Sequence, residues 1–147
     1  MTALALVVAL AGPPLAVDNG CRCTDLDPTL AAFTRLAAAA VLASTGRALT
    51  CHNGRRRGRL HEQGRAVDLV LDGTWNYRRT VAEYEAGGST RAALSTVGQL
   101  AAWTGMRWGL AAWGRLDEVG HFERPAGFRW PVPGLLLAVL PAVGGCR

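Results

Sequence analysis

The sequence predicts one globular domain in which helices pack against a small sheet. Half of the 147 residues are apolar, which suits a single domain with a substantial hydrophobic core. Long stretches repeat apolar residues at helical spacing, and short apolar or alternating stretches typical of strands lie between and after them. These observations together indicate one mixed domain and not a repeat array or a disordered chain.

The first helix is expected to begin at Asp27-Pro28 and to end at Gly46. Asp27 supplies a capping carboxylate, and Pro28 lacks only an N–H that the first helical turn leaves unbonded. Glycine is common just past the end of a helix. The apolar residues that recur at helical spacing between these ends are Leu30, Phe33, Ala37, Ala40 and Val41.

Two strands are expected next, over residues 47–51 and 65–71, with a polar loop over 52–59 between them. Successive side chains of a strand point to opposite faces. In the second strand this predicts an apolar face on the core and a face carrying Asp68 that lines a cleft. The cleft face holds Ala66, Asp68 and Val70, and the core face holds Val67, Leu69 and Leu71.

The helical pattern resumes over residues 77–86, breaks at Gly87-Gly88 and continues over 90–103, with Gly105 at its end. Residues 106–110 and 120–123 are expected to form two further short strands. We therefore place the folded domain at residues 19–130.

Both ends of the chain are apolar. Residues 1–18 carry no charge before Asp18, which is typical either of a secretion signal or of a first apolar element packed on the domain. This segment and the apolar tail at 131–147 are both shorter than the roughly 20 residues that cross a bilayer. We expect no stable membrane span. The protein is expected either to be exported, to the periplasm or the extracellular space, or to be phage-associated.

The four cysteines permit two disulfides in an oxidising compartment, by any of three pairings. They are Cys21, Cys23, Cys51 and Cys146. A zinc site made from Cys21 and Cys23 is the alternative, but it lacks the usual two-residue gap and a nearby histidine.

The net charge of +5 favours an anionic partner. The run from Arg55 to Arg57 lies in a glycine-rich loop, and no basic helix with interleaved aromatics follows it. We therefore expect no nucleic-acid partner.

A candidate zinc site involves two of the three histidines. A catalytic zinc needs three protein ligands and an open position, and His61, Asp68 and His121 would supply two imidazoles and a carboxylate. Gly64 would allow a turn with positive φ between the first two. Glu118, three residues before His121, is the candidate base that takes a proton from water. If residues 117 and 118 are extended, the adjacent Asp117 points to the opposite face.

Two segments resemble the zinc D-Ala-D-Ala carboxypeptidases and L-alanyl-D-glutamate endopeptidases of bacterial cell walls and phage endolysins. The family pattern is S-x-H-x-x-G-x-A-x-D, then a tryptophan- and glycine-rich segment, then D/E-x-x-H, often continued as H-F-E. Here "LHEQGRAVDLVL" and "GMRWGLAAWGRLDEVGHFE" follow it in order, within roughly residues 47–123. The matching positions are His61, Gly64, Ala66, Asp68, Glu118, His121, Phe122 and Glu123.

This resemblance implies a small α+β domain whose central antiparallel sheet is flanked by helices and carries the zinc site on one face. It implies that His61, Asp68 and His121 bind Zn²⁺ and that Glu118 is the catalytic base. The substrate-holding arginine of the family would correspond to Arg55. The implied activity is hydrolysis of peptidoglycan stem peptides by a monomeric enzyme, as a D-alanyl-D-alanine carboxypeptidase or, alternatively, as an endopeptidase of the endolysin type.

Two positions depart from the family pattern. Arg59 stands where the family has serine, and Gly120 stands where it has proline. Neither position binds metal in the family, so the departures affect substrate choice more than zinc binding.

Two other classes of protein remain open. The first segment and the "GGC" near the C-terminus are also similar to the signalling domain of hedgehog proteins, which implies a non-catalytic zinc domain. A structural wall or virion protein with a vestigial site is the third reading, against which the presence of Glu118 argues.

The remaining aromatic residues are expected to be structural. His52 is expected to be exposed in a polar loop, with an auxiliary role at the cleft edge as the alternative. Core or cleft-wall positions are expected for Trp75, Trp103, Trp108, Trp113 and Trp130.

Overall fold

A four-stranded antiparallel sheet organises the domain. The computed structural model describes residues 26–53, 59–73 and 76–129, and all further structural statements concern these ranges. The strand order is β1-β2-β4-β3, and every neighbouring pair is antiparallel. The strands are β1 (Leu49–Asn53), β2 (Ala66–Leu71), β3 (Arg107–Trp108) and β4 (His121–Glu123). Together with the helices, this sheet confirms the α+β fold class.

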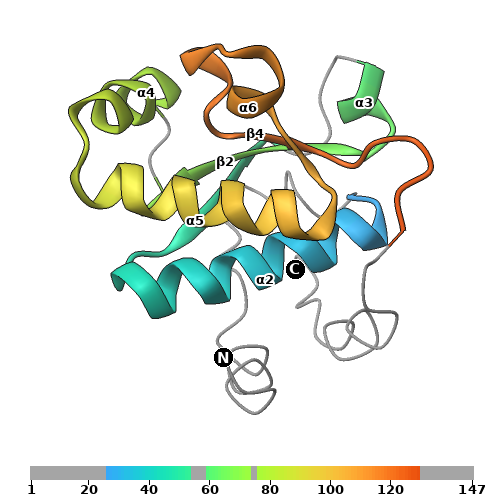
Figure 1. Cartoon of the computed structure of the whole chain (residues 1–147), viewed down its shortest axis with the longest axis horizontal. Helices are drawn as coiled ribbons and strands as arrows, with labels where there is room; N and C mark the ends of the chain where they lie inside the picture. Colours follow the sequence, from blue (N-terminus) through green and yellow to red (C-terminus); the bar gives the residue numbers. More distant parts are fainter. Residues whose placement is uncertain (1–25, 54–58, 74–75, 130–147) are drawn as a thin grey trace.

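Helices lie on both sides of the sheet (Figure 1). On one side α2 and α5 lie next to each other, and on the other side are the shorter α3, α4 and α6. The helices are α2 (Pro28–Thr45), α3 (Arg59–Glu62), α4 (Tyr77–Ala86), α5 (Gly88–Thr104) and α6 (Gly109–Trp113), followed by the 3₁₀ turn η1 (Leu116–Glu118). The expected segments 1–18 and 131–147 lie outside the described residues.

Helix α2 has the predicted ends. The Asp27 carboxylate accepts a hydrogen bond from the Thr29 N–H at 3.0 Å, and Pro28 occupies the first turn. Gly46 ends the helix with a φ of 69°, a left-handed conformation that glycine adopts without the strain a Cβ would add.

The alternation along β2 is as predicted, but both of its faces are buried. Val67, Leu69 and Leu71 join the core formed with α2 and α5, in which Phe33 and Leu94 are fully buried. The other face was expected to line a cleft. It is buried as well, because α3 and α4 pack against β2 and α6 packs against β4.

The second half of the chain follows the prediction with one correction. The helix over 77–86 has the expected bounds, and α5 begins at Gly88, two residues before the expected start. Residues 106–110 do not form one strand, because β3 stops at Trp108 and α6 begins at Gly109. Trp108 is half-buried and packs against the core, where its ring stacks parallel to Phe122 at 6.2 Å.

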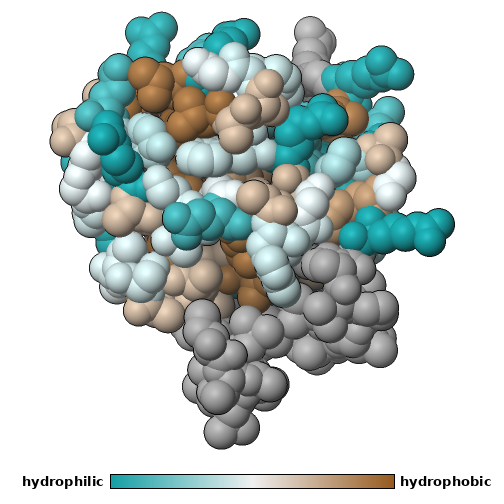
Figure 2. Space-filling view, viewed as in Figure 1, coloured by the Kyte–Doolittle hydropathy of each residue, from teal (hydrophilic) through white to brown (hydrophobic). Residues whose placement is uncertain are grey.

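The surface on the side of Figure 2 is mostly hydrophilic or neutral, and hydrophobic atoms gather in its upper part between α4 and α6. Trp103 is exposed, so the expectation that it lies in the core or a cleft wall is wrong. Trp75 and Trp130 lie outside the described residues. Among the described helices, α2 is long and apolar enough to cross a membrane by length and composition alone, but Leu30 and Phe33 on it are buried against the rest of the domain.

Replacing Asp27 tests the cap that starts α2. Asp27→Ala removes the bond to Thr29 and the ion pair with Arg124 at 3.1 Å. The free energy of unfolding, measured by urea denaturation, should fall by about 1 kcal/mol. Loss of a helix cap typically costs about 0.5–2 kcal/mol. Asp27→Asn keeps the capping oxygen and loses only the charge, so it should lose less. If the free energy of unfolding fell equally in both variants, the ion pair with Arg124 and not the cap would account for the loss.

Candidate metal centre

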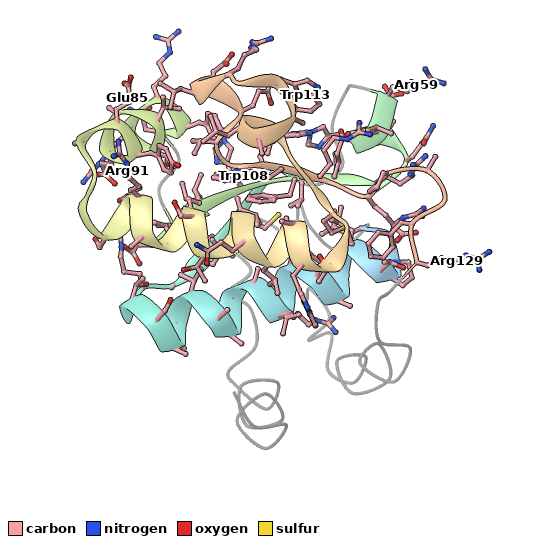
Figure 3. All side chains as sticks on the ribbon, in the orientation of Figure 1. Arg59, Glu85, Arg91, Trp108, Trp113 and Arg129 are labelled. Atoms are coloured by element: carbon pink, nitrogen blue, oxygen red, sulfur yellow. The ribbon has the colours of Figure 1, made fainter. Side chains whose placement is uncertain are left out.

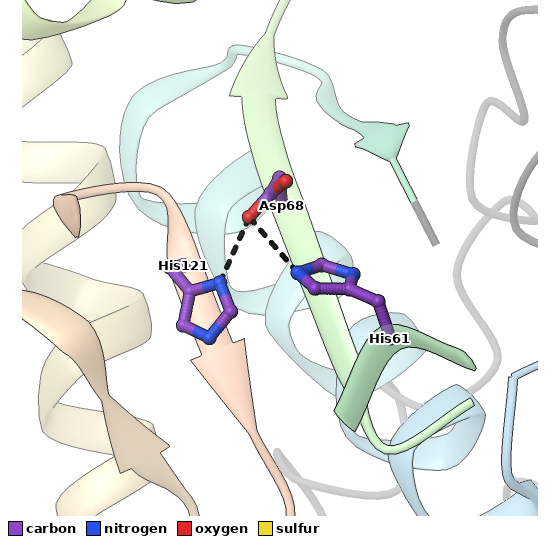
Figure 4. Close-up of side chains that lie close together, drawn as sticks. All are labelled: His61, Asp68 and His121. Carbon is purple, nitrogen blue, oxygen red and sulfur yellow. Dashed lines mark hydrogen bonds and ion pairs between the residues drawn. The ribbon is translucent and has the colours of Figure 1, made fainter. Parts of the chain in front are cut away.

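Three side chains from three elements meet on the sheet face opposite α2 and α5. They are His61 on α3, Asp68 on β2 and His121 on β4 (Figure 4). Each offers one ligand atom, and these atoms all lie within 4.8 Å of one another. The residues are only 4%, 6% and 8% exposed, respectively. The structure therefore brings together the three residues predicted as metal ligands.

A tight turn between α3 and β2 places His61. A polar loop was expected over residues 52–59, but a short helix, Arg59–Glu62, begins at its end. The Gly64 N–H bonds to the His61 carbonyl at 2.9 Å, and Gly64 has the positive φ predicted for it, 67°. This conformation turns the chain back at once, so that His61 lies over the strand that carries Asp68.

Strand register places the other two ligands. Asp68 pairs directly with His121 across β2 and β4, so both side chains leave the same face of the sheet. The Asp68 Oδ1 lies 2.9 Å from His121 Nδ1 and 3.7 Å from His61 Nε2. The two imidazole rings meet edge to face at 5.1 Å between centroids.

The donor set suits a divalent metal ion. Two imidazoles and one carboxylate are the nitrogen and oxygen donors of many catalytic zinc sites. Donor atoms bound to one zinc at about 2.0–2.2 Å lie roughly 3 to 4 Å apart. The separations of 2.9 and 3.7 Å fall near this range, so the three residues are compatible with a shared ion.

His121 lies between two carboxylates. Its Nδ1 faces Asp68, and its Nε2 lies 3.4 Å from Glu123 Oε2. Burial by itself would lower the pKa of His121, but the hydrogen bond and charge of Asp68, with smaller effects of Glu123 and Glu118, raise it above its ordinary value of 6.5.

Tyr77 supports the backbone just before His121. The Gly120 N–H donates a hydrogen bond of 2.8 Å to the Tyr77 hydroxyl. Burial of the Tyr77 hydroxyl, with the nearby charges of Asp68 and Glu118, raises its pKa, so it stays protonated. A Cβ at position 120 would lie 2.4 Å from the Leu69 carbonyl oxygen and 2.8 Å from Cε2 of the Tyr77 ring. The neighbours of position 120 therefore require glycine there.

Glu118 and Trp113 border the three candidate ligands. Glu118 is half-buried on η1, and its charge acts on His121. Trp113, at the end of α6 (Figure 3), has its ring 5.5 Å from the ring of His121 and is 45% exposed. Gly109 allows both to approach, because a Cβ there would lie 2.8 Å from the Glu118 Cβ and 2.9 Å from the Trp113 ring.

Asp117 and Glu118 lie in different environments on a 3₁₀ turn. Residues 116–118 form a 3₁₀ turn, so the expectation of an extended stretch is wrong. Asp117 is exposed and accepts a hydrogen bond from Arg115 Nε at 3.0 Å, which holds the pKa of its carboxyl below the usual range. Glu118 is the more buried of the two.

The other residues singled out in the sequence do not all lie where they were expected. Arg55 lies outside the described residues. Arg59 is exposed and points away from the domain (Figure 3). His52 was expected in an exposed loop, but it is half-buried on β1 and stacks on Tyr77 at 6.2 Å. Cys51 is disulfide-bonded, and the other three cysteines lie outside the described residues.

No protein-family model, curated protein or solved structure matches this chain. The chemistry of the site therefore has to be inferred from its own residues.

Three residues around the site, Glu123, Arg107 and Tyr77, were not assigned a role from the sequence, whereas Trp113 was expected at a core or cleft-wall position. The sequence did indicate that Glu123 lies near the site, because residues two apart on a strand share a face and His121 was already a candidate ligand. It gave no such indication for Arg107 and Tyr77, because their positions at the site depend on strand pairing and on contacts between distant segments.

Substitution at Gly120 should disturb the site without touching a ligand. In Gly120→Ala the new Cβ must displace the Leu69 carbonyl or β4, which should lower the free energy of unfolding by about 1–3 kcal/mol and weaken metal binding. Gly120→Pro also removes the N–H bonded to Tyr77 and should be worse. Gly127→Asn, where nothing lies within 4 Å, is the control for denaturation and zinc titration. Wild-type behaviour of Gly120→Pro would contradict the assigned packing.

The raised pKa of His121 predicts opposite pH trends with and without metal. Without metal, the protonated imidazole contributes stability that is fully present below pH 6.5 and is lost as the pH rises through the raised pKa. Zinc needs the neutral imidazole, so stabilisation by zinc should grow over the same interval. Thermal unfolding at a series of pH values, with chelator or with zinc, measures both trends. His121→Gln should abolish them, and a zinc effect independent of pH would contradict the ligand assignment.

Proposed function

We propose that this chain is a zinc-dependent peptidase that hydrolyses peptidoglycan stem peptides, acting as a D-alanyl-D-alanine carboxypeptidase. The observation that carries the proposal is the convergence of His61, Asp68 and His121 on one face of the sheet. These are the positions at which the sequence resembles the ligands of the cell-wall zinc peptidases. A coincidence of motif and geometry is stronger support than either alone.

Zinc is the metal that this donor set favours. His61 and His121 would each provide an imidazole nitrogen, and Asp68 would provide a carboxylate oxygen. Three protein donors leave one position of a four-coordinate ion for another ligand, as catalytic sites require. A zinc ion held there supplies a Lewis acid that polarises a carbonyl group and lowers the pKa of water to about 7.

Glu118 is the proposed general base. Its carboxylate lies three residues before His121, on the 3₁₀ turn that leads into β4. It is half-buried, whereas Asp117 is engaged with Arg115 at the surface. Glu118 would accept a proton from the attacking water and deliver it to the amine nitrogen that leaves when the peptide bond breaks.

Trp113 is the proposed wall of the substrate site. Its ring is near His121, and nearly half of its surface is exposed, so one side of the indole can contact a bound peptide. An apolar wall beside the reacting bond suits the methyl side chains of a terminal alanine dipeptide. The basic net charge of +5 suits an anionic cell wall.

Burial of the ligands favours a second candidate function, a non-catalytic zinc domain. All three residues are less than a tenth exposed, as in sites where a metal serves stability. The two functions differ in what Glu118 does, because only a peptidase needs a base beside the ligands.

Replacing Glu118 separates these functions. Glu118→Gln should leave zinc content near wild type and lower the rate of stem-peptide hydrolysis by about 10²–10⁴-fold, because a base and not a ligand is lost. Mass spectrometry of muropeptides incubated with zinc-loaded protein measures the products. Loss of one terminal alanine indicates the carboxypeptidase, and cleavage after L-alanine indicates the endopeptidase.

Two controls accompany this experiment. Asp117→Asn removes a neighbouring carboxylate that is exposed, and it should retain activity. Asp68→Asn should instead lower zinc content itself. Hydrolysis by Glu118→Gln at the wild-type rate would refute its role, and zinc bound without cleavage by the wild type would favour the non-catalytic domain.

A further inference from the structure

We infer that Glu123, held in place by Arg107, is a positioning residue that orients His121 toward the metal. This inference rests on the metal site of the proposed function but goes beyond it. The resemblance extends to Glu123 as part of an H-F-E ending, yet it assigns no role to this residue.

The geometry of β4 brings the two side chains together. Glu123 lies two residues after His121 on an antiparallel strand, so both point to the face that carries Asp68. The Glu123 Oε2 lies 3.4 Å from His121 Nε2, on the opposite side of the ring from Asp68. The ring is thus held between two carboxylates, with Nδ1 directed to the candidate ligand cluster.

Arg107 fixes the other carboxylate oxygen. Arg107 pairs with Glu123 across β3 and β4, and its Nη1 donates to Glu123 Oε1 at 2.6 Å. Glu123 is 3% exposed, whereas the Arg107 side chain is 48% exposed. A buried carboxylate with no partner would be costly, so the arginine reaching in from the surface offsets the burial of Glu123 and holds its carboxylate in one orientation.

This arrangement has a definite chemical consequence. A histidine that binds metal through one ring nitrogen donates the proton on its other nitrogen to a second group, which fixes both tautomer and ring orientation. Glu123 is the group at that position on His121. The three donors that cluster within 4.8 Å do not include Glu123, so the geometry gives it the role of orienting a ligand and not of binding the ion.

Titration of the purified protein with Zn²⁺ and Co²⁺ tests the inference. The isosteric Glu123→Gln should fold normally by circular dichroism, bind zinc about 10- to 100-fold more weakly in competition with a chelator, and give an altered visible spectrum with Co²⁺. Arg107→Gln leaves the carboxylate facing His121 and should lose less affinity. Glu83→Gln is the matched control, because Glu83 pairs with Arg79 at 2.7 Å on α4 but does not face His121.

The outcomes separate this inference from the function on which it rests. Unchanged affinity and an unchanged Co²⁺ spectrum in Glu123→Gln would overturn the positioning role. Loss of metal as complete as in Asp68→Asn would also overturn it, because Glu123 would then be a ligand. A wild type that binds neither ion would overturn the metal site itself. A wild type that binds zinc but cleaves no stem peptide removes the peptidase proposal and leaves the role of Glu123 intact.

Discussion

The antiparallel pairing of β2 with β4 is the constraint on which the candidate site depends. It sets Asp68 opposite His121, 53 residues away in the chain. The same register sends Val67 and Phe122 to the core below α2 and α5. A slip of one residue would move Val67 and Phe122 to the face of the site and place Asp68 and His121 in the apolar core, so the core and the site specify the same register. The hydrophobic effect that closes the domain therefore also assembles the site.

Burial of the three ligands has a cost that the surroundings must offset. A buried carboxylate is unfavourable unless it is paired, and Asp68 lies beside two imidazoles that can carry its countercharge. Below the raised pKa of His121, a proton on its ring provides that charge in the metal-free state, and a bound metal ion would replace it. The charges at the site thus favour a proton or a cation beside Asp68.

Sequence patterns located most elements and the three clustered residues, and missed what depends on long-range contact. Asp27 and Gly46 mark the ends of α2 because capping is local chemistry. The period of β2 separates its two faces correctly, but it does not reveal that α3, α4 and α6 also bury the second face. The five-residue α6 is too short for helical periodicity to identify. The environments of His52 and Trp113 follow from such packing and carry no local signal.

The candidate ligands and the candidate base are held in position by different parts of the fold. Two of the ligands lie on paired strands of the sheet, and His61 is tied to it by the turn at Gly64. Glu118 lies on a 3₁₀ turn whose position is set by α6 and by the close approach that Gly109 allows. Under the proposed function, changes in the α6–η1 segment would alter proton transfer by Glu118 and contact with a substrate without disturbing the three candidate metal ligands. Zinc binding alone would therefore not establish a peptidase, and replacement of Glu118 decides between the two proposed functions.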